Sequence, residues 1–395
     1  MRVCLLSPEL LPAWGGIGAY TYHLAKGLSR YAEVHVLTAN RPDPEESRTL
    51  DGVRVHAVLG DRSSDAHVSP LRFQLAVSVH LPRLIRQFGF DIVHANHAYM
   101  SDLFVRPRRD RAVQVLTVHT TLDTQRSGTK GAGTQSPRQG IEKTVLRWRT
   151  PLELVEGRYL RRNSHFIFVS NWVRWNAVEH YRIRPLLSAV VPNGVDPSLF
   201  TPETQGSSER RNEGPTILFA GRLLALKGIE TLLRAVSELG GDIRLLLAGP
   251  GDRTRWRALA RSLGLGPDRC AFLGPVPYAE MPALYRRANA VVLPSHVESC
   301  PMVALEAMAS GVPLIASAAG GIPEIVRDGV TGWLFLPGDV GRLRERLELV
   351  LGDGSQVRDV CRAAREWVVS QATVDRMVVE TLRFYERLLN GGGAS

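Results

Sequence analysis

Two carboxylates near the expected start of a helix could bind a ligand that carries both phosphate and hydroxyl groups. Glu298 and Glu306 lie in the stretch 294–311, PSHVESCPMVALEAMASG, which follows a short apolar strand. Ser299 with Pro301 is typical of an N-cap followed by a first-turn proline, so a helix is predicted to open near Pro301. Its free amides could hold a phosphate, and the carboxylates could accept hydrogen bonds from hydroxyls, as a sugar nucleotide would require. The alternative is a helix with a solvated glutamate at each end.

Two cations precede this stretch at the end of another predicted strand. Arg222 and Lys227 stand five residues apart in the loop GRLLALKG at 221–228. A guanidinium can bind phosphate oxygens in a bidentate manner and a lysine adds a point charge, so together they could neutralise a departing diphosphate. No Asp-x-Asp pair lies at a strand edge where it could hold Mg²⁺ or Mn²⁺, so metal-independent chemistry is predicted. The alternative is a solvated basic loop.

The first half of the chain offers a glycine cluster and one histidine. Gly15, Gly16 and Gly18 follow the first strand but lack the G-x-G-x-x-G spacing, so a dinucleotide cofactor is not expected. Gly16 lies where a helix N-terminus can present amides to a phosphate. His119 follows the strand 113–118, at the edge where doubly wound sheets bind ligands, and it could contact a transferred group. The alternatives are a tight turn without a ligand and a structural histidine.

Strands and helices that alternate along the chain must position these residues. Strands are predicted in the first half at 2–6, 34–37, 53–57, 92–94, 113–118, 166–169 and 189–191. A second series follows at 216–220, 243–248, 270–273, 290–293, 314–316 and 333–335, with helices between the strands. This pattern predicts an α/β fold with two doubly wound, Rossmann-like domains, whose ligand site is the cleft between their facing carboxyl edges.

Composition narrows the class of protein. A chain of 395 residues is too long for one ordinary core, and the polar stretch 201–215 is typical of a domain linker. The four cysteines have no metal-like spacing and a strand begins at residue 2, which favours a reducing, cytoplasmic location without a signal peptide. No window is long and apolar enough to cross a bilayer, so any membrane contact would be peripheral, at the inner face.

The net charge of +10 favours an anionic partner. The segment 126–162, called the basic segment below, holds nine Lys or Arg and three Glu, and therefore six of the net positive charges. Its glycine-rich part, 126–140, is predicted to be a mobile loop that faces an acceptor or an anionic surface; the alternative is a solvated insertion. No RNA-binding signature accompanies these charges, so nucleic acid is not expected as a partner.

Taken together, the motifs resemble the family 4 retaining glycosyltransferases of the GT-B fold. The resemblance spans nearly the whole chain and rests on GGIG at 15–18, VPNGVD at 191–196, GRLLALKG at 221–228, ESCPMVALE at 298–306 and ASAAGGIPEIVRDGVTGWLF at 316–335. It implies an N-terminal domain of residues 1–200, on the acceptor side, completed by a crossing helix at 372–389. The nucleotide-sugar domain would comprise residues 201–371.

The resemblance also implies roles for individual residues. Arg222 and Lys227 would hold the donor diphosphate, Glu306 the nucleotide ribose, and Gly16 would approach the diphosphate from the other domain. His119 would lie near the transferred sugar. Glu298 and the residues after it would contact the donor sugar: Ser299, Cys300, Pro301, Met302 and Val303. The loop from Phe272 to Val276 would pass the nucleobase. Cys300 stands where the family often has Phe, which leaves the donor preference open.

The expected activity is transfer of a hexosyl unit, with retention, from a UDP- or GDP-sugar to an acceptor hydroxyl. The nucleotide sugar is a co-substrate, and no cofactor is expected. The acceptor could be a sugar, a lipid-linked sugar or a small hydroxylated molecule. A sugar-nucleotide epimerase on the same architecture and a non-catalytic homologue that binds anions or membranes are the alternatives. The intact set of Arg222, Lys227, Glu298 and Glu306 argues against the non-catalytic one.

Overall fold

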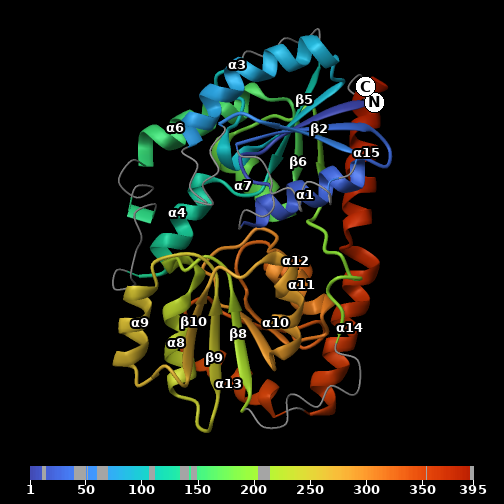
Figure 1. The fold of residues 1–395 in the computed structure, drawn as a ribbon. Coiled ribbons are helices and arrows are strands. Elements are labelled where there is room, and N and C mark those ends of the chain that lie inside the picture. Colours follow the sequence, from blue (N-terminus) through green and yellow to red (C-terminus); the bar gives the residue numbers. More distant parts are fainter. Residues whose placement is uncertain are drawn as a thin grey trace. The chain divides into compact units, whose positions relative to one another are not determined.

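The computed structural model describes residues 1–10, 15–39, 50, 52–59, 70–105, 112–133, 142–143, 149–202, 214–352 and 354–391. The chain divides into two compact units. The first unit contains Met1–Thr121, Thr150–Gly194 and Val374–Ser395, and the second contains Leu122–Arg149 and Val195–Thr373. Figure 1 labels the main elements of both units.

This division differs from the predicted one in two places. The first unit passes to the second after Gly194 instead of after residue 200, and the segment Leu122–Arg149 belongs to the second unit although it was predicted within the first. The C-terminal helix α15, Val374–Leu389, belongs to the first unit.

The first unit contains a seven-stranded parallel sheet. Its strand order is β3-β2-β1-β4-β5-β6-β7, so the order reverses between β1 and β4. The strands are β1 Arg2–Leu6, β2 Glu33–Thr38, β3 Val53–Ala57, β4 Ile92–Asn96, β5 Val113–Val118, β6 His165–Phe168 and β7 Leu187–Val190. The other described elements are α1 Gly16–Leu28, α3 Pro70–Phe88, η1 His97–Tyr99, α6 Arg149–Arg162, α7 Asn171–Tyr181 and α15.

The second unit contains a six-stranded parallel sheet. Its strand order is β10-β9-β8-β11-β12-β13, and the order reverses between β8 and β11. The strands are β8 Thr216–Ala220, β9 Arg244–Ala248, β10 Cys270–Gly274, β11 Ala290–Leu293, β12 Leu314–Ser317 and β13 Trp333–Phe335. The other described elements are α4 Leu122–Gly131, η3 Ala225–Lys227, α8 Ile229–Ser237, α9 Arg253–Ser262, η4 Tyr278–Glu280, α10 Met281–Arg287, α11 Met302–Ala309, α12 Ile322–Ile325, α13 Val340–Leu351 and α14 Ser355–Gln371.

Continuous apolar runs explain the two parallel sheets. Every residue of β8 and of β11 is buried, as expected for central strands that helices cover on both faces. The helices are amphipathic: α15 buries Met377, Val378 and Thr381 at helical spacing and packs against α1. The prediction of two doubly wound α/β domains is confirmed.

The prediction of a mobile loop at 126–140 is wrong for residues 126–131. Residues 126–131 belong to helix α4, whose buried residues are Thr124, Gly128 and Thr129. Asp123 and Arg126 form an ion pair of 2.5 Å one turn apart, and their side chains are only 14% and 12% exposed. Packing on the second unit therefore stabilises a helix that its glycines and polar residues disfavour. Residues 134–140 lie outside the described part of the chain.

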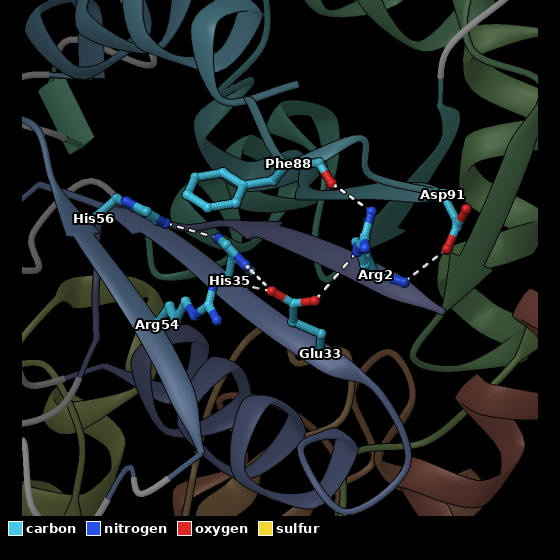
Figure 2. Close-up of polar contacts among 7 residues, drawn as sticks. All are labelled: Arg2, Glu33, His35, Arg54, His56, Phe88 and Asp91. Atoms are coloured by element: carbon cyan, nitrogen blue, oxygen red, sulfur yellow. Dashed lines mark hydrogen bonds and ion pairs between the residues drawn. The ribbon is translucent and has the colours of Figure 1, made fainter. Parts of the chain in front are cut away.

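A polar cluster lies at the amino ends of the first strands of the first sheet. Figure 2 shows Glu33 between His35 and Arg2. Glu33 Oε2 accepts from Arg2 Nε at 3.2 Å, and Glu33 Oε1 lies 3.2 Å from His35 Nε2. His35 Nδ1 lies 2.8 Å from His56 Nε2, and Arg54 pairs with Glu33 at 3.0 Å. Arg2 begins β1 and Glu33 begins β2, so the cluster is at the edge opposite to the carboxyl ends where such sheets bind ligands. We therefore interpret it as structural.

The stability of the protein should fall as the pH falls below about 6.5. Burial lowers the pKa of His94 and of His119 to about 3 and also lowers that of His35 and His56. A histidine with a depressed pKa stabilises the fold above its unfolded pKa, and this contribution is lost as the pH falls toward the folded pKa. Glu306, whose pKa burial raises to about 7, acts in the opposite sense.

The histidines outnumber this carboxyl, so unfolding should take up at least about one net proton near pH 5.5, or ~1.4 kcal/mol per pH unit. Urea unfolding midpoints measured from about pH 7.5 to about pH 5.5 should therefore decrease. A midpoint that stays constant or rises over this range would contradict the assignment of neutral, buried histidines.

Candidate functional site

Two loops meet at the point where the strand order of the second sheet reverses. One follows β8 and contains η3, and the other follows β11; ligands of open α/β sheets bind at such a point. His296 N–H donates to Leu226 O at 2.8 Å and joins the two loops. Gly228 has φ of +68°, and an added Cβ would lie 1.9 Å from Pro294 O. Only glycine fits this approach, which holds the residue next to Lys227 against the second loop.

Lys227 and Glu298, one from each loop, form an ion pair. Lys227 Nζ lies 2.5 Å from Glu298 Oε1, and the two side chains are 18% and 10% exposed. Ser295 Oγ donates to the same carboxylate oxygen at 2.7 Å, and Gly321 N–H donates to Glu298 O at 2.9 Å. The ammonium group is thus held in a fixed position, with little solvent around it, at the carboxyl edge of the sheet.

Arg222 follows β8 directly and lies at the same carboxyl edge. It is exposed, and within the described residues its guanidinium makes no hydrogen bond or ion pair. Val276 follows the carboxyl end of β10 and is half-buried. The second unit therefore presents Arg222 and the paired Lys227 at a single sheet edge, where they could bind an anionic ligand.

The helix after Glu298 begins one residue later than predicted. α11 starts at Met302, and the residue that caps it is Pro301, which makes no side-chain capping hydrogen bond. The predicted N-cap role of Ser299 is therefore wrong, because the chain stays extended through Pro301, with φ of −72° and ψ of 123°. Cys300, Pro301 and Met302 are buried, whereas Ser299 and Val303 are half-buried.

Glu306 lies on the buried side of α11. It is 5% exposed, and its Oε2 accepts a hydrogen bond of 2.7 Å from the hydroxyl of Tyr285 on α10. Burial raises the pKa of Glu306 to about 7, and the hydrogen bond from Tyr285 partly opposes this rise. A carboxyl with this pKa can exist in either protonation state near neutral pH, and its charged form is the better acceptor for a ligand hydroxyl.

In the first unit, His119 lies at the carboxyl end of β5 and is 8% exposed. Its Nε2 lies 3.1 Å from Asn96 Oδ1. Asn96 Nδ2 donates to Thr21 Oγ1 at 3.0 Å, and this hydrogen bond orients the amide so that its oxygen faces the histidine. The ring of Tyr20 packs edge-on against it at 4.5 Å. Burial lowers the pKa of His119 to about 3. The imidazole is therefore neutral, with the proton on Nε2 and an acceptor lone pair on Nδ1.

A chain of buried hydrogen bonds supports this histidine. Tyr20 OH lies 3.2 Å from Thr117 Oγ1, which lies 2.5 Å from His94 Nε2. His94 Nδ1 lies 2.5 Å from the hydroxyl of Tyr385 on α15. Gly16, the first residue of α1, is exposed at the carboxyl edge of β1, next to the reversal of strand order in the first sheet.

The predicted residues thus fall into two groups, one in each unit. Sequence reasoning missed Tyr285, Ser295, Asn96 and Tyr20, because nothing along the sequence links them to their partners. Within the described residues, no three or more His, Cys, Asp or Glu side chains are grouped so that they could hold a metal ion. None of the described helices has the length and apolar character needed to span a membrane.

Comparison with known proteins defines the class. A model described as Glycosyltransferase Family 4 matches residues 14–199, and one described as Glycosyl transferases group 1 matches residues 200–367. D-inositol 3-phosphate glycosyltransferases from Corynebacterium diphtheriae and Corynebacterium aurimucosum are 31% and 37% identical to this chain, over 89% of its length in both cases. The matches cover 87% and 88% of those two proteins.

Solved structures agree in fold. A sucrose-phosphate synthase from Thermosynechococcus elongatus superposes with a TM-score of 0.79 at 23% identity, over 99% of each chain. The two parallel-sheet units and these matches define a glycosyltransferase with the GT-B fold. The chain belongs to the family 4 glycosyltransferases, and the resemblance inferred from its motifs is confirmed.

Proposed function

We propose that the protein transfers a hexosyl unit from a UDP- or GDP-sugar to an acceptor hydroxyl, with retention of configuration and without a metal ion. The observation that carries this proposal is the Lys227–Glu298 pair, which lies at the same sheet edge as exposed Arg222, where the strand order of the second sheet reverses. Two cations at that edge suit a diphosphate, and the adjacent carboxylate suits sugar hydroxyls.

In the proposed reaction, the bond between the sugar C1 and the diphosphate oxygen breaks, and its electron pair goes to the diphosphate. Arg222 and Lys227 stabilise the charge that develops there. The acceptor oxygen forms a bond to C1 on the face that the diphosphate leaves, and the acceptor proton passes to a phosphate oxygen. Glu298 orients Lys227 and a donor-sugar hydroxyl, while neutral His119 accepts a hydrogen bond from the transferred sugar through Nδ1.

The remaining donor contacts are proposed as the family resemblance implies. Glu306 would accept hydrogen bonds from the ribose, Gly16 of the first unit would approach the diphosphate, and residues 299–303 would contact the donor sugar. Val276 borders the nucleobase. A sugar-nucleotide epimerase would act on the donor without an acceptor, so release of nucleoside diphosphate upon addition of an acceptor separates the two reactions.

The test is a screen of UDP- and GDP-hexoses with the purified protein. Melting temperature is first measured with UDP, GDP and ADP, because a ligand that binds only the native state raises it. Nucleoside diphosphate release is then measured with and without acceptors, beginning with D-inositol 3-phosphate, on which the named relatives act. Release from one donor that an acceptor accelerates would support the proposal, and no release from any UDP- or GDP-hexose would overturn it.

Turnover should continue in EDTA. Arg222 and Lys227 supply the positive charge that a divalent ion would otherwise bring to the leaving diphosphate. The measurement is the initial rate after dialysis against EDTA, compared with the rate after Mg²⁺ or Mn²⁺ is added back. Transfer that EDTA abolishes and either ion restores would contradict metal independence.

We also propose a cytoplasmic protein that contacts an anionic membrane peripherally. The four cysteines are free, in agreement with a reducing compartment. Within the basic segment, Arg126 and Arg162 form ion pairs inside the protein, whereas Lys130, Lys143 and Arg158 are exposed. Each exposed charge could add about 1 kcal/mol of attraction to an anionic surface.

Replacement of Lys130, Lys143 and Arg158 by Gln should therefore reduce cosedimentation with anionic liposomes at low salt, with donor affinity unchanged. A wild-type protein that stays in the supernatant would exclude membrane contact. Two further basic residues, Arg138 and Arg147, lie outside the described part of the chain.

A further inference from the structure

The segment that begins at Leu122, shortly after His119, belongs to the second unit and contains helix α4, which Figure 1 labels. α4 packs against η3, the short helix that ends at Lys227. Ala132, just after α4, joins the hydrophobic core of the second unit. The segment that contains α4 is therefore an integral part of the second unit, which holds the candidate diphosphate site.

α4 contacts both loops of that site. Gly128 faces Val297, the neighbour of Glu298 in the loop after β11, and also Leu226 in the loop after β8. Gly131 faces the ring of His296.

Glu142, eleven residues after the end of α4, also reaches the loop after β8. Its side chain is 2% exposed, and its Oε1 accepts the backbone N–H of Leu226 at 3.1 Å. The residues next to Lys227 and next to Glu298 are thus both in contact with the segment that contains α4 and Glu142.

The approach at Gly128 depends on the missing side chain. A Cβ added there would lie 2.3 Å from Val297 Cγ1 and 3.0 Å from Val297 Cβ. Alanine is a better helix former than glycine, so the glycine at position 128 makes α4 intrinsically less stable. The same glycine allows a close contact between α4 and the loop of Glu298.

We propose that Gly128 and Glu142 are positioning residues for the donor diphosphate site, which they hold in place through the loops of Lys227 and Glu298. This inference rests on the proposed function. Gly128 sets the position of Val297 and so of the Glu298 carboxylate, and Glu142 sets that of the Ala225–Leu226 peptide, just before Lys227. The ion pair between Lys227 and Glu298 joins the two loops, so a shift of either loop changes the distance between Lys227 Nζ and Glu298 Oε1.

The central test is Gly128→Ala, studied with a matched control and a rescue. The control is Gly341→Ala in α13, where the added Cβ would meet only Asp339 Oδ1 at 3.8 Å. Gly128→Ala should lower kcat/KM for the donor at least about tenfold and weaken binding of UDP or GDP, with the acceptor KM unchanged. Gly341→Ala should behave as wild type. In the double variant Gly128→Ala/Val297→Ala, the Val297 Cγ1 methyl group that would collide with the added Cβ is absent. Most of the lost kcat/KM and nucleotide affinity should therefore be recovered.

Glu142 gives an independent test. Glu142→Gln keeps the acceptor for Leu226 N–H and should retain nucleotide affinity, whereas Glu142→Ala should weaken it several-fold. Circular dichroism and urea unfolding check that each variant is folded. A Gly128→Ala protein that is folded and binds nucleotide as wild type does would overturn the inference, as would a loss that Val297→Ala fails to relieve. Failure of the wild type to bind UDP or GDP would instead count against the proposed function.

Discussion

Replacement of Lys227 by alanine is expected to lower turnover by about two to three orders of magnitude while the fold is retained. Lys227 Nζ is held by Glu298 at 2.5 Å and is 18% exposed, so its charge acts where water screens it little. Its removal takes a preorganised cation from the leaving diphosphate and leaves Glu298 as an uncompensated anion beside it. Arg222→Ala should have an effect of the same order, since it removes the second cation.

The measurement is the steady-state turnover of both variants with the identified donor, compared with that of the wild type. Arg261→Ala is a suitable control, because Arg261 is an exposed cation in the last turn of α9, in the same unit. The control should keep wild-type turnover, which separates the effect of a local charge from that of net charge. If Lys227→Ala and Arg222→Ala both stayed within a few-fold of wild type, the diphosphate assignment would fail.

The second large effect concerns Glu306. Glu306→Gln should weaken nucleotide binding roughly 10- to 100-fold, the range for the loss of a hydrogen bond to a charged group. The loss should appear mainly in KM for the donor, because the ribose is held equally in the ground state and in the transition state. Unchanged affinity for Glu306→Gln at about pH 8 would contradict the ribose assignment.

The protonation of Glu306 makes nucleotide binding depend on pH. Its pKa is about 7 in the free protein, and a hydroxyl that donates to the carboxylate favours the charged form. Binding should therefore release protons near neutral pH and weaken as the pH falls below about 7, and Glu306→Gln should lose this dependence. Tyr285→Phe removes the hydrogen bond that lowers the pKa, so the same profile should move to higher pH.

Much of the fold was predictable because parallel strands are continuous apolar runs between turn residues. The strands at 53–57, 113–118, 216–220 and 290–293 have the predicted bounds. Helix α4 was missed because its sequence, LDTQRSGTKG, has the glycines and polar residues of a loop, and only packing on the second unit makes it helical.

The pattern of the site was predictable, but its internal contacts were not. Strand ends and glycine positions place Lys227 and Glu298 at one sheet edge, as their sequence motifs indicate. Tyr285 is 21 residues from Glu306, and Asn96 is 23 residues from His119, so only the folded sheet brings each pair together. No local pattern marks Tyr285 or Asn96 as a partner.

If Arg222 and Lys227 hold the donor diphosphate, the second unit must bind a nucleoside diphosphate. The most direct measurement is a calorimetric titration of UDP and of GDP, in EDTA, into the wild-type protein and into Lys227→Ala. We expect at least one nucleotide to bind the wild type with one site per chain and Lys227→Ala to lose most of this affinity. Absence of binding by both nucleotides, or equal affinity in Lys227→Ala, would contradict this expectation.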